Sequence, residues 1–82
     1  MNRITVLFFA TLKDRAGLRR TELDLPEGTR IRELRAILGE RFPALLPALP
    51  SALVAINRDY ATDDEIIPAG AEVALFPPVS GG

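Results

Sequence analysis

The first apolar segment of the chain has the pattern of a β-strand with two buried faces. Residues 4–10 are rich in β-branched and aromatic side chains, which alternate between one face (Ile4, Val6, Phe8) and the other (Leu7, Phe9). A strand that is apolar on both sides is typical of the centre of a sheet. The polar residues 13–17, which end in a glycine, predict a turn after this strand.

The next two segments predict a second strand and a helix. Residues 20–25 alternate strictly and form a hairpin partner for the first strand, with Thr21, Leu23 and Leu25 facing inward and Glu22 and Asp24 facing solvent. From residue 31 the apolar positions recur every three or four residues, as in a helix with one buried face: Ile31, Leu34, Ile37, Leu38 and Phe42. Thr29 is the expected N-cap, and Pro43 ends the helix at Phe42 at the latest.

Prolines and short strands make up the second half of the chain. Residues 43–50 contain three prolines, which predicts an irregular connector with Leu45, Leu46 and Leu49 tucked beneath it. Three further strands are predicted at residues 53–56, at residues 60–62 after a turn over 57–59, and at residues 72–76. Pro68 and Gly70 suit positions i+1 and i+3 of a type I turn before the last strand.

This order of elements predicts an α+β fold of the ubiquitin-like β-grasp type. A hairpin, one main helix and returning strands make a mixed sheet of about five strands around the helix. The first and last strands then lie side by side in the middle and run parallel. We expect residues 1–76 to form this β-grasp domain and residues 77–82 to form an extended C-terminal tail ending in Gly-Gly.

Composition narrows the function. The chain has 82 residues, of which 48% are hydrophobic and 26% charged, and this fits one globular domain. It has no cysteine and no histidine, which removes the thiolate nucleophile, the commonest general base and the commonest metal ligand. A net charge of -1 argues against nucleic acid or a membrane as the main partner, and without a signal peptide a cytoplasmic location is expected. A binding or carrier role is favoured over catalysis.

The C-terminal segment is the one motif that carries chemistry. Pro77 and Pro78 end the sheet and project the residues after them, Val79, Ser80, Gly81 and Gly82, as a stiff arm that reaches about 13 Å at roughly 3.3 Å per residue. The two glycines have no Cβ, so the arm fits a narrow channel and leaves the Gly82 carbonyl open to attack. The Gly82 carboxylate is a poor electrophile at pH 7, so another enzyme must activate it, for example as an acyl-adenylate made from ATP. The alternative is a frayed terminus without a function.

The chain resembles the small subunits of molybdopterin synthase, a family of ubiquitin-like sulfur carriers in molybdenum cofactor biosynthesis. The resemblance rests on residues 6–10, residues 54–57 and above all residues 72–82. Gly81-Gly82 alone would also suit a thiamin-type sulfur carrier, a tRNA-thiolating modifier or ubiquitin.

The resemblance implies how the tail is used. An E1-like adenylyltransferase activates Gly82 with ATP, and Gly82 becomes a thiocarboxylate that donates sulfur to cyclic pyranopterin monophosphate to form the molybdopterin dithiolene. This chain would be the non-catalytic subunit of a heterotetramer of two small and two large subunits, binding no metal or cofactor itself, with the catalytic groups on the large subunit. The alternatives are a carrier for thiamin or tRNA thiolation and a non-covalent ubiquitin-like interaction module.

Large apolar side chains on the second face of the sheet predict a partner interface. If Val6 and Phe8 meet the helix, then the opposite face carries Leu7, Phe9 and Phe76, with Tyr60 at its edge. The alternative is that the connector 43–50 covers these side chains as a second small core.

Two charged groups have a functional and a structural interpretation. The helix arginines (Arg30, Arg32, Arg35, Arg41) suit an anion site, but the acidic residues among them favour a solvated surface with a few intrahelical ion pairs. Residues 63–65 are acidic, and their spacing favours a solvated turn over a cation site.

Overall fold

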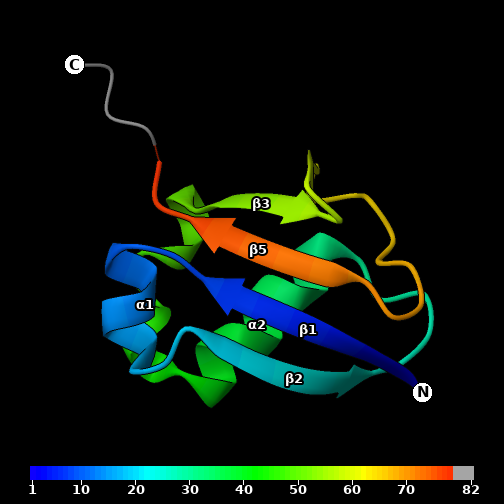
Figure 1. The fold of residues 1–82 in the computed structure, drawn as a ribbon, viewed down its shortest axis with the longest axis horizontal. Helices are drawn as coiled ribbons and strands as arrows, with labels where there is room; N and C mark the ends of the chain where they lie inside the picture. The colour runs from blue at the N-terminus through cyan, green and yellow to red at the C-terminus, as the bar shows by residue number, and fades with distance from the viewer. Residues whose placement is uncertain (79–82) are drawn as a thin grey trace.

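The computed structural model describes residues 1–78, which form a five-stranded mixed sheet with a long helix across one face and a short helix at the end of the central strands (Figure 1). The strands are β1 (Asn2–Phe8), β2 (Arg20–Leu25), β3 (Leu53–Ile56), β4 (Asp59–Tyr60) and β5 (Glu72–Phe76). The helices are α1 (Thr11–Ala16) and α2 (Ile31–Arg41), followed by two 3₁₀ helices, Pro43–Leu45 and Leu49–Ser51. The strand order in the sheet is β2-β1-β5-β3-β4.

The first and last strands lie side by side at the centre of the sheet, as predicted. β1 runs parallel to β5, with Val6 opposite Val73 and Phe8 opposite Leu75. β1 pairs antiparallel with β2, and β5 pairs antiparallel with β3. The α+β fold with a mixed sheet around one main helix is therefore confirmed.

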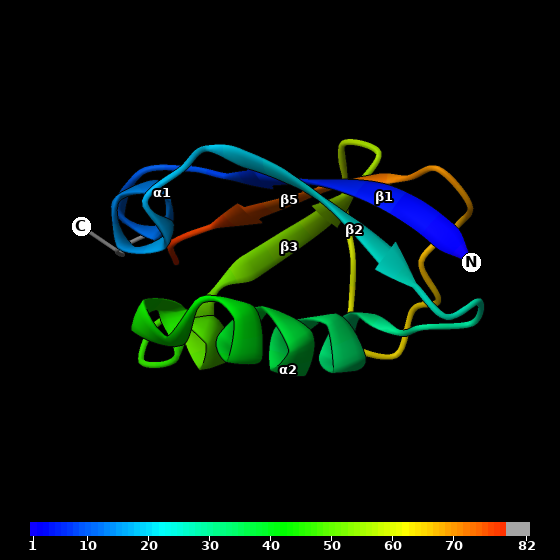
Figure 2. The same ribbon diagram turned by 90° about the horizontal axis from the view of Figure 1, so that it is seen from below.

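The core lies between the sheet and α2, which crosses one face of it (Figure 2). Alternate residues of β1 and β5 point into this layer and are fully buried: Ile4, Val6, Phe8, Val73 and Leu75. Ile31, Leu34 and Leu38 meet them from α2. The Phe8 ring packs edge-on against Phe42, with ring centroids 5.5 Å apart. The helical period in residues 31–42 thus identified the buried face of α2.

The turn predicted over residues 13–17 is wrong, because residues 13–16 belong to α1 and Gly17 is its C-cap. This helix has six residues, and Leu12 is its buried member, so the segment is too short to show a helical period. Gly17 ends it at a positive φ of 79°, and its N–H donates to the Lys13 carbonyl. The first strand also lies two residues earlier than predicted, over Asn2–Phe8.

The start of α2 differs from the prediction as well. The N-cap is Arg30 rather than Thr29, whose buried hydroxyl donates to the Pro26 carbonyl over 2.6 Å. Carbonyl oxygens from the loop before β5 accept the first N–H groups of the helix: Ile31 N–H donates to Glu65 O and Arg32 N–H to Asp63 O. Two contacts from a distant loop thus take the place of the predicted Thr29 cap, and Glu33 adds a local contact by accepting from Arg30 N–H over 2.9 Å.

The acidic loop holds the helix arginines. Arg35 Nε lies 2.9 Å from an Asp63 carboxylate oxygen, and Arg32 pairs with Asp64. The intrahelical ion pairs expected for these arginines are therefore wrong, since both partners come from a loop about thirty residues further along the chain. Asp63 and Asp64 are exposed, as expected of a solvated turn, but they also fasten the loop to α2.

The connector lies beside α2 on the helical side of the sheet (Figure 2). Leu45 and Leu49 are buried as predicted, whereas Leu46 is 56% exposed, so its predicted burial is wrong. The 3₁₀ turns direct residues 45 and 49 inward and leave residue 46 outside. Leu46 lies over Gly39, where a Cβ would come within 2.6 Å of Leu46 Cδ2.

The turn before β5 is shifted by one residue from its prediction. The Ala71 N–H donates to the Pro68 carbonyl over 3.2 Å, so Pro68 and Gly70 occupy positions i and i+2. Gly70 has a φ of 69°, a conformation that favours glycine at that position. The fourth strand is likewise displaced, to Asp59–Tyr60, after a turn in which Asn57 and Arg58 have positive φ. No helix among residues 1–78 is long and apolar enough to cross a membrane.

Candidate functional site: an apolar patch at the end of the central strands

The outer face of the sheet, which points away from α2, changes character along the strands. Because β1 and β5 are parallel, their carboxyl ends meet at the same edge of the sheet, beside α1 (Figure 1). Toward the other end, the outer face is charged and carries Arg3, Glu22, Asp24 and Glu72. Toward the carboxyl ends it is apolar. The apolar part of the outer face therefore lies at the end of β5, directly before Pro77.

Two stacked phenylalanine rings form the centre of the apolar part. The Phe9 and Phe76 rings have centroids 4.7 Å apart and planes inclined by 12°. Tyr60 from the edge strand lies 6.5 Å from Phe76 by ring centroids. Phe9 remains 41% exposed and Tyr60 73% exposed, which leaves a group of large apolar side chains in contact with solvent. Exposed groups of this kind are typical of partner-binding surfaces.

The predicted interface residues are thus brought together. Phe9, Tyr60 and Phe76 make ring contacts, and Leu7 lies half-buried on the same face of β1. The alternative, in which the connector covers these side chains, is wrong, because the connector packs against α1 and α2 on the opposite side of the sheet.

Two further residues of this face, Leu53 and Ala74, were not predicted from the sequence. Leu53 is paired directly with Phe76, and Ala74 with Leu7, and both are half-buried. The alternation within β5 places Ala74 on the same side as Phe76, so that residue was recoverable from the sequence. Leu53 was not, because its face depends on the register between β3 and β5. We call the set Leu7, Phe9, Leu53, Tyr60, Ala74 and Phe76 the outer patch.

A strained residue holds Phe9 in the outer patch. Ala10 has φ 52° and ψ −127°, a backbone conformation that costs an L-residue roughly 1–3 kcal/mol. Ala10 lies at the corner between the end of β1 at Phe8 and the start of α1 at Thr11. Phe9 is fixed on both sides of this corner, since its N–H donates to Leu75 O and its carbonyl accepts from Leu12 N–H, each over 3.1 Å.

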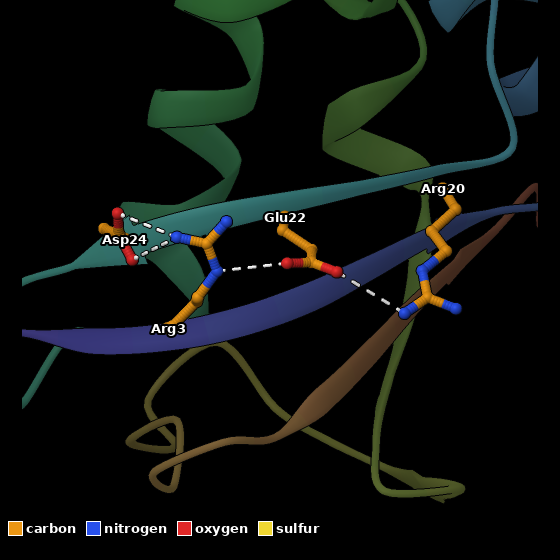
Figure 3. Close-up of polar contacts among 4 residues, drawn as sticks. All are labelled: Arg3, Arg20, Glu22 and Asp24. Carbon is orange, nitrogen blue, oxygen red and sulfur yellow. Dashed lines mark hydrogen bonds and ion pairs between the residues drawn. The ribbon is translucent and has the colours of Figure 1, made fainter.

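The charged end of the outer face is organised around Arg3 (Figure 3). Arg3 Nε donates to Glu22 over 3.0 Å, and a terminal nitrogen reaches Asp24 at 3.4 Å. Arg20 contacts Glu22 from the other side at 3.5 Å. The hydrogen bond from Arg3, reinforced by its positive charge, holds the pKa of the Glu22 carboxyl below its usual value. The same bond raises the pKa of Arg3 further.

The tail begins directly beside the outer patch. β5 ends at Phe76, and Pro77 and Pro78 follow outside the sheet. The remaining predicted tail residues, Val79, Ser80, Gly81 and Gly82, lie outside the described residues. Within residues 1–78, no group of three or more acidic side chains is placed to hold a metal ion.

The chain matches a known protein family over most of its length. The profile of the ThiS family matches residues 6–82. The chain belongs to the ThiS family. Within that family, it is 37% identical over 81 residues to the molybdopterin synthase sulfur carrier subunit of Escherichia coli (strain K12), covering 96% of this chain and 99% of that one. The relative of the same name from Chlamydomonas reinhardtii is 34% identical and covers 98% of this chain and 99% of that one.

Solved structures agree with this placement in the ThiS family. A putative molybdopterin converting factor subunit 1 from Pyrococcus furiosus superposes with a TM-score of 0.87 at 29% identity, covering 96% of this chain and all of that one. A protein in the complex of subunits 1 and 2 of molybdopterin-converting factor from Helicobacter pylori superposes with a TM-score of 0.70 at 26% identity, covering 98% and 99%. The ubiquitin-like β-grasp assignment is confirmed.

Proposed function

We propose that this chain is the sulfur carrier subunit of a molybdopterin synthase. The observation that carries the proposal is the shared location of two features: an exposed aromatic patch and the exit of the C-terminal tail lie at the same edge of the sheet. A partner that binds the outer patch receives the tail in a defined direction. The relatives named molybdopterin synthase sulfur carrier subunit match nearly the whole chain and support this assignment.

The reactive group in this proposal is the α-carboxylate of Gly82. Its oxygen attacks the α-phosphate of ATP, which forms a glycyl adenylate and releases pyrophosphate. Hydrosulfide released by a sulfur donor then attacks the carbonyl carbon of the adenylate, so that a C–S bond forms, AMP leaves and Gly82 ends in a thiocarboxylate. The thiocarboxylate supplies the sulfur nucleophile that the chain otherwise lacks, since it contains no cysteine.

The outer patch serves docking rather than chemistry. A central aromatic cluster with a polar surround is the usual anatomy of a protein interface, and Phe9 and Phe76 supply such a cluster here. The partner is the large synthase subunit, which provides the catalytic groups and the pocket for cyclic pyranopterin monophosphate. The assembly contains two small and two large subunits, and an E1-like adenylyltransferase binds the free carrier before it docks.

The residues of the tail suit a chain that carries the reacting group into the active site of a partner. Pro77 and Pro78 have fixed φ angles and no N–H, so they neither extend the sheet nor fold back into a helix. The glycines at 81 and 82 have no side chain to exclude from a narrow active-site channel. The chain itself remains a non-catalytic subunit of a transferase complex.

Intact mass spectrometry tests the proposal. We expect incubation with the activating enzyme, ATP and a sulfur donor to raise the mass of the chain by the difference between sulfur and oxygen, located on the terminal peptide. Adding the large subunit and cyclic pyranopterin monophosphate should return the chain to its carboxylate mass. A variant that lacks Gly82 should unfold at the same temperature as the wild type and gain no sulfur. An unchanged wild-type mass, with the activating enzyme shown to be active on another carrier, contradicts the proposal.

A further inference from the structure

A group of basic side chains borders the outer patch on the α1 side. Lys13 of α1, Arg19 and Arg20 line a depression of about 340 Å³ together with Leu7 and Phe9. The depression is therefore continuous with the patch. Arg20 stands directly opposite Leu7 in the β1–β2 pairing, and thus on the same outer face. We call Lys13, Arg19 and Arg20 the basic rim.

The backbone beneath the basic rim is fixed. The Arg19 carbonyl accepts from Phe8 N–H over 2.9 Å, and the Lys13 carbonyl accepts from Gly17 N–H over 3.0 Å. Both side chains therefore start from ordered backbone, and both line the depression that Phe9 lines. Ordered backbone beneath the rim leaves less conformational freedom to lose on binding, which favours one orientation of the partner.

Two of the three cationic side chains on the basic rim form no ion pair within residues 1–78. These are Lys13 and Arg19, whereas Arg20 contacts Glu22 at 3.5 Å. Asp14 lines a neighbouring hollow with Lys13 and Arg19 but, in the part of the chain that the structure describes, forms an ion pair with neither of them. By contrast, the arginines of α2 that lie near acidic groups are paired with them.

The two ends of the outer face carry opposite net charge. The far end carries Arg3 with three carboxylates, those of Glu22, Asp24 and Glu72, so its net charge is negative. The basic rim carries three cations. A partner that lies across the outer patch meets positive charge on one side of Phe9 and negative charge beyond Thr5.

We infer that the basic rim is a second docking element, which pairs with aspartate or glutamate side chains on the large synthase subunit and sets the orientation in which the outer patch binds. The inference rests on the proposed function, because it takes the large subunit as the occupant of the patch. Continuity with the patch and the unused charges favour a protein carboxylate. A nucleic acid is disfavoured, since three cations beside an apolar surface with net-negative charge beyond it do not form a basic track.

Binding kinetics with the large subunit test the inference. The variants Lys13→Glu and Arg19→Glu, alone and combined, place a carboxylate where the partner carboxylate binds. The combined variant should associate about tenfold more slowly than the wild type at low salt, because rim charges act mainly on the association rate. The difference should shrink toward zero in about 1 M salt, where the Debye length falls to about 3 Å.

Arg41→Glu is the matched control. Arg41 is exposed in the last turn of α2, on the opposite side of the sheet, and its reversal changes the net charge as much as Arg19→Glu does. It should change the association rate by less than about twofold. The milder Lys13→Gln, which removes charge without reversing it, repeats the test with little risk to folding.

The outcomes separate the two proposals. If the wild type binds the large subunit and the rim variants behave as Arg41→Glu does, the basic rim is not a docking element and the proposed function stands. Salt-independent association of the wild type would overturn the rim in the same way. If the wild type gains sulfur but does not bind the large subunit, both the rim and the assignment to molybdopterin synthase fall. Tighter binding of the wild type to an RNA oligonucleotide than to the large subunit would assign the rim to nucleic acid.

Discussion

The Phe9 ring lies face to face with the Phe76 ring, 4.7 Å away by centroids, although the two residues are separated by almost the whole chain. The contact joins the ends of the two central strands, because Phe9 follows β1 directly and Phe76 is the last residue of β5. The same two rings lie beside the start of the tail, in the outer patch to which the proposed function assigns docking.

Phe9→Ala should therefore weaken binding of the large subunit by about thirtyfold, as expected for loss of a central aromatic anchor worth about 2 kcal/mol. Because the Phe9 ring is 41% exposed, the variant should remain folded. Isothermal titration with the large subunit measures the effect. Phe76→Ala should show a similar loss, measured at a temperature at which the variant is shown to be folded, since β5 is a central strand.

Leu46→Ala is the control for these two variants. Leu46 is also a large apolar residue, 56% exposed, but it lies on the connector at the helical side of the sheet. Its truncation should leave the affinity for the large subunit unchanged. Wild-type affinity in both phenylalanine variants would place the interface elsewhere on the molecule.

The sequence was sufficient to predict those parts of the fold and site that depend only on residues close together in the chain. The alternation in residues 4–10 places Leu7 and Phe9 opposite the core, and the period of α2 identifies its buried face. Two prolines after an apolar strand mark the end of the sheet at Phe76. These features depend on strand and helix geometry alone.

The parts that escaped prediction depend on contacts between distant segments. Leu53 joins the outer patch only through the register of β3 with β5. Asp63 reaches Arg35 across 28 positions, and the carbonyl of Asp63 accepts from Arg32 N–H at the start of α2. α1 was missed for the opposite reason, since six residues with Leu12 as the buried member give no period to detect.

Ala10→Gly should stabilise the protein by about 1 kcal/mol. Ala10 has a positive φ of 52°, and glycine removes the steric cost of that conformation, roughly 1–3 kcal/mol. The gain is reduced by the larger entropy of glycine in the unfolded chain, roughly 0.4–1 kcal/mol. Urea unfolding of the two proteins measures the difference. A lower unfolding free energy for Ala10→Gly would show that the corner is not strained.

The Arg3–Glu22 pair should make stability depend on pH in a defined direction. The pKa of Glu22 is lower in the folded protein than its ordinary value, so the folded state binds fewer protons than the unfolded state. The stabilisation is present above the unfolded pKa of about 4.5 and is lost as pH falls through the lower folded value. Both groups are exposed, so the effect is small and falls with salt.

Glu22→Gln tests this direction. The variant should be less stable than the wild type at neutral pH and low salt, and the gap should close below about pH 4. In an Arg3→Gln background, the same substitution should produce a smaller gap, because the main cause of the lowered pKa is gone. Thermal unfolding as a function of pH, with all four proteins, measures both effects. A gap that widens in acid contradicts the assignment.

Asn2 is the buried polar side chain that fastens the start of β1 to the loop before β5. Its amide nitrogen donates to the carbonyls of Ile67 and Pro68 at 3.2 and 3.0 Å, and its oxygen accepts from Gly70 N–H at 2.9 Å. Asn2 is 7% exposed, and its hydrogen bond to the Ile67 carbonyl is buried, so that carbonyl loses a buried donor when the side chain is removed. Asn2→Ala should therefore cost about 1–3 kcal/mol of unfolding free energy, the usual penalty for unpaired buried groups.

Asn2→Asp separates the two halves of this arrangement. The carboxylate keeps the acceptor for Gly70 N–H but sets a negative charge against two carbonyl oxygens, so we expect a loss at pH 7 larger than that of Asn2→Ala. Burial and the two carbonyls raise the pKa of the new carboxyl in the folded state, so the folded protein binds the proton more tightly than the unfolded chain. The loss should accordingly diminish as pH falls from 7 toward 4, since a protonated carboxyl donates one of the two lost hydrogen bonds. Urea unfolding at several pH values measures this, and a pH-independent difference from the wild type would show that residue 2 does not face the carbonyls of Ile67 and Pro68.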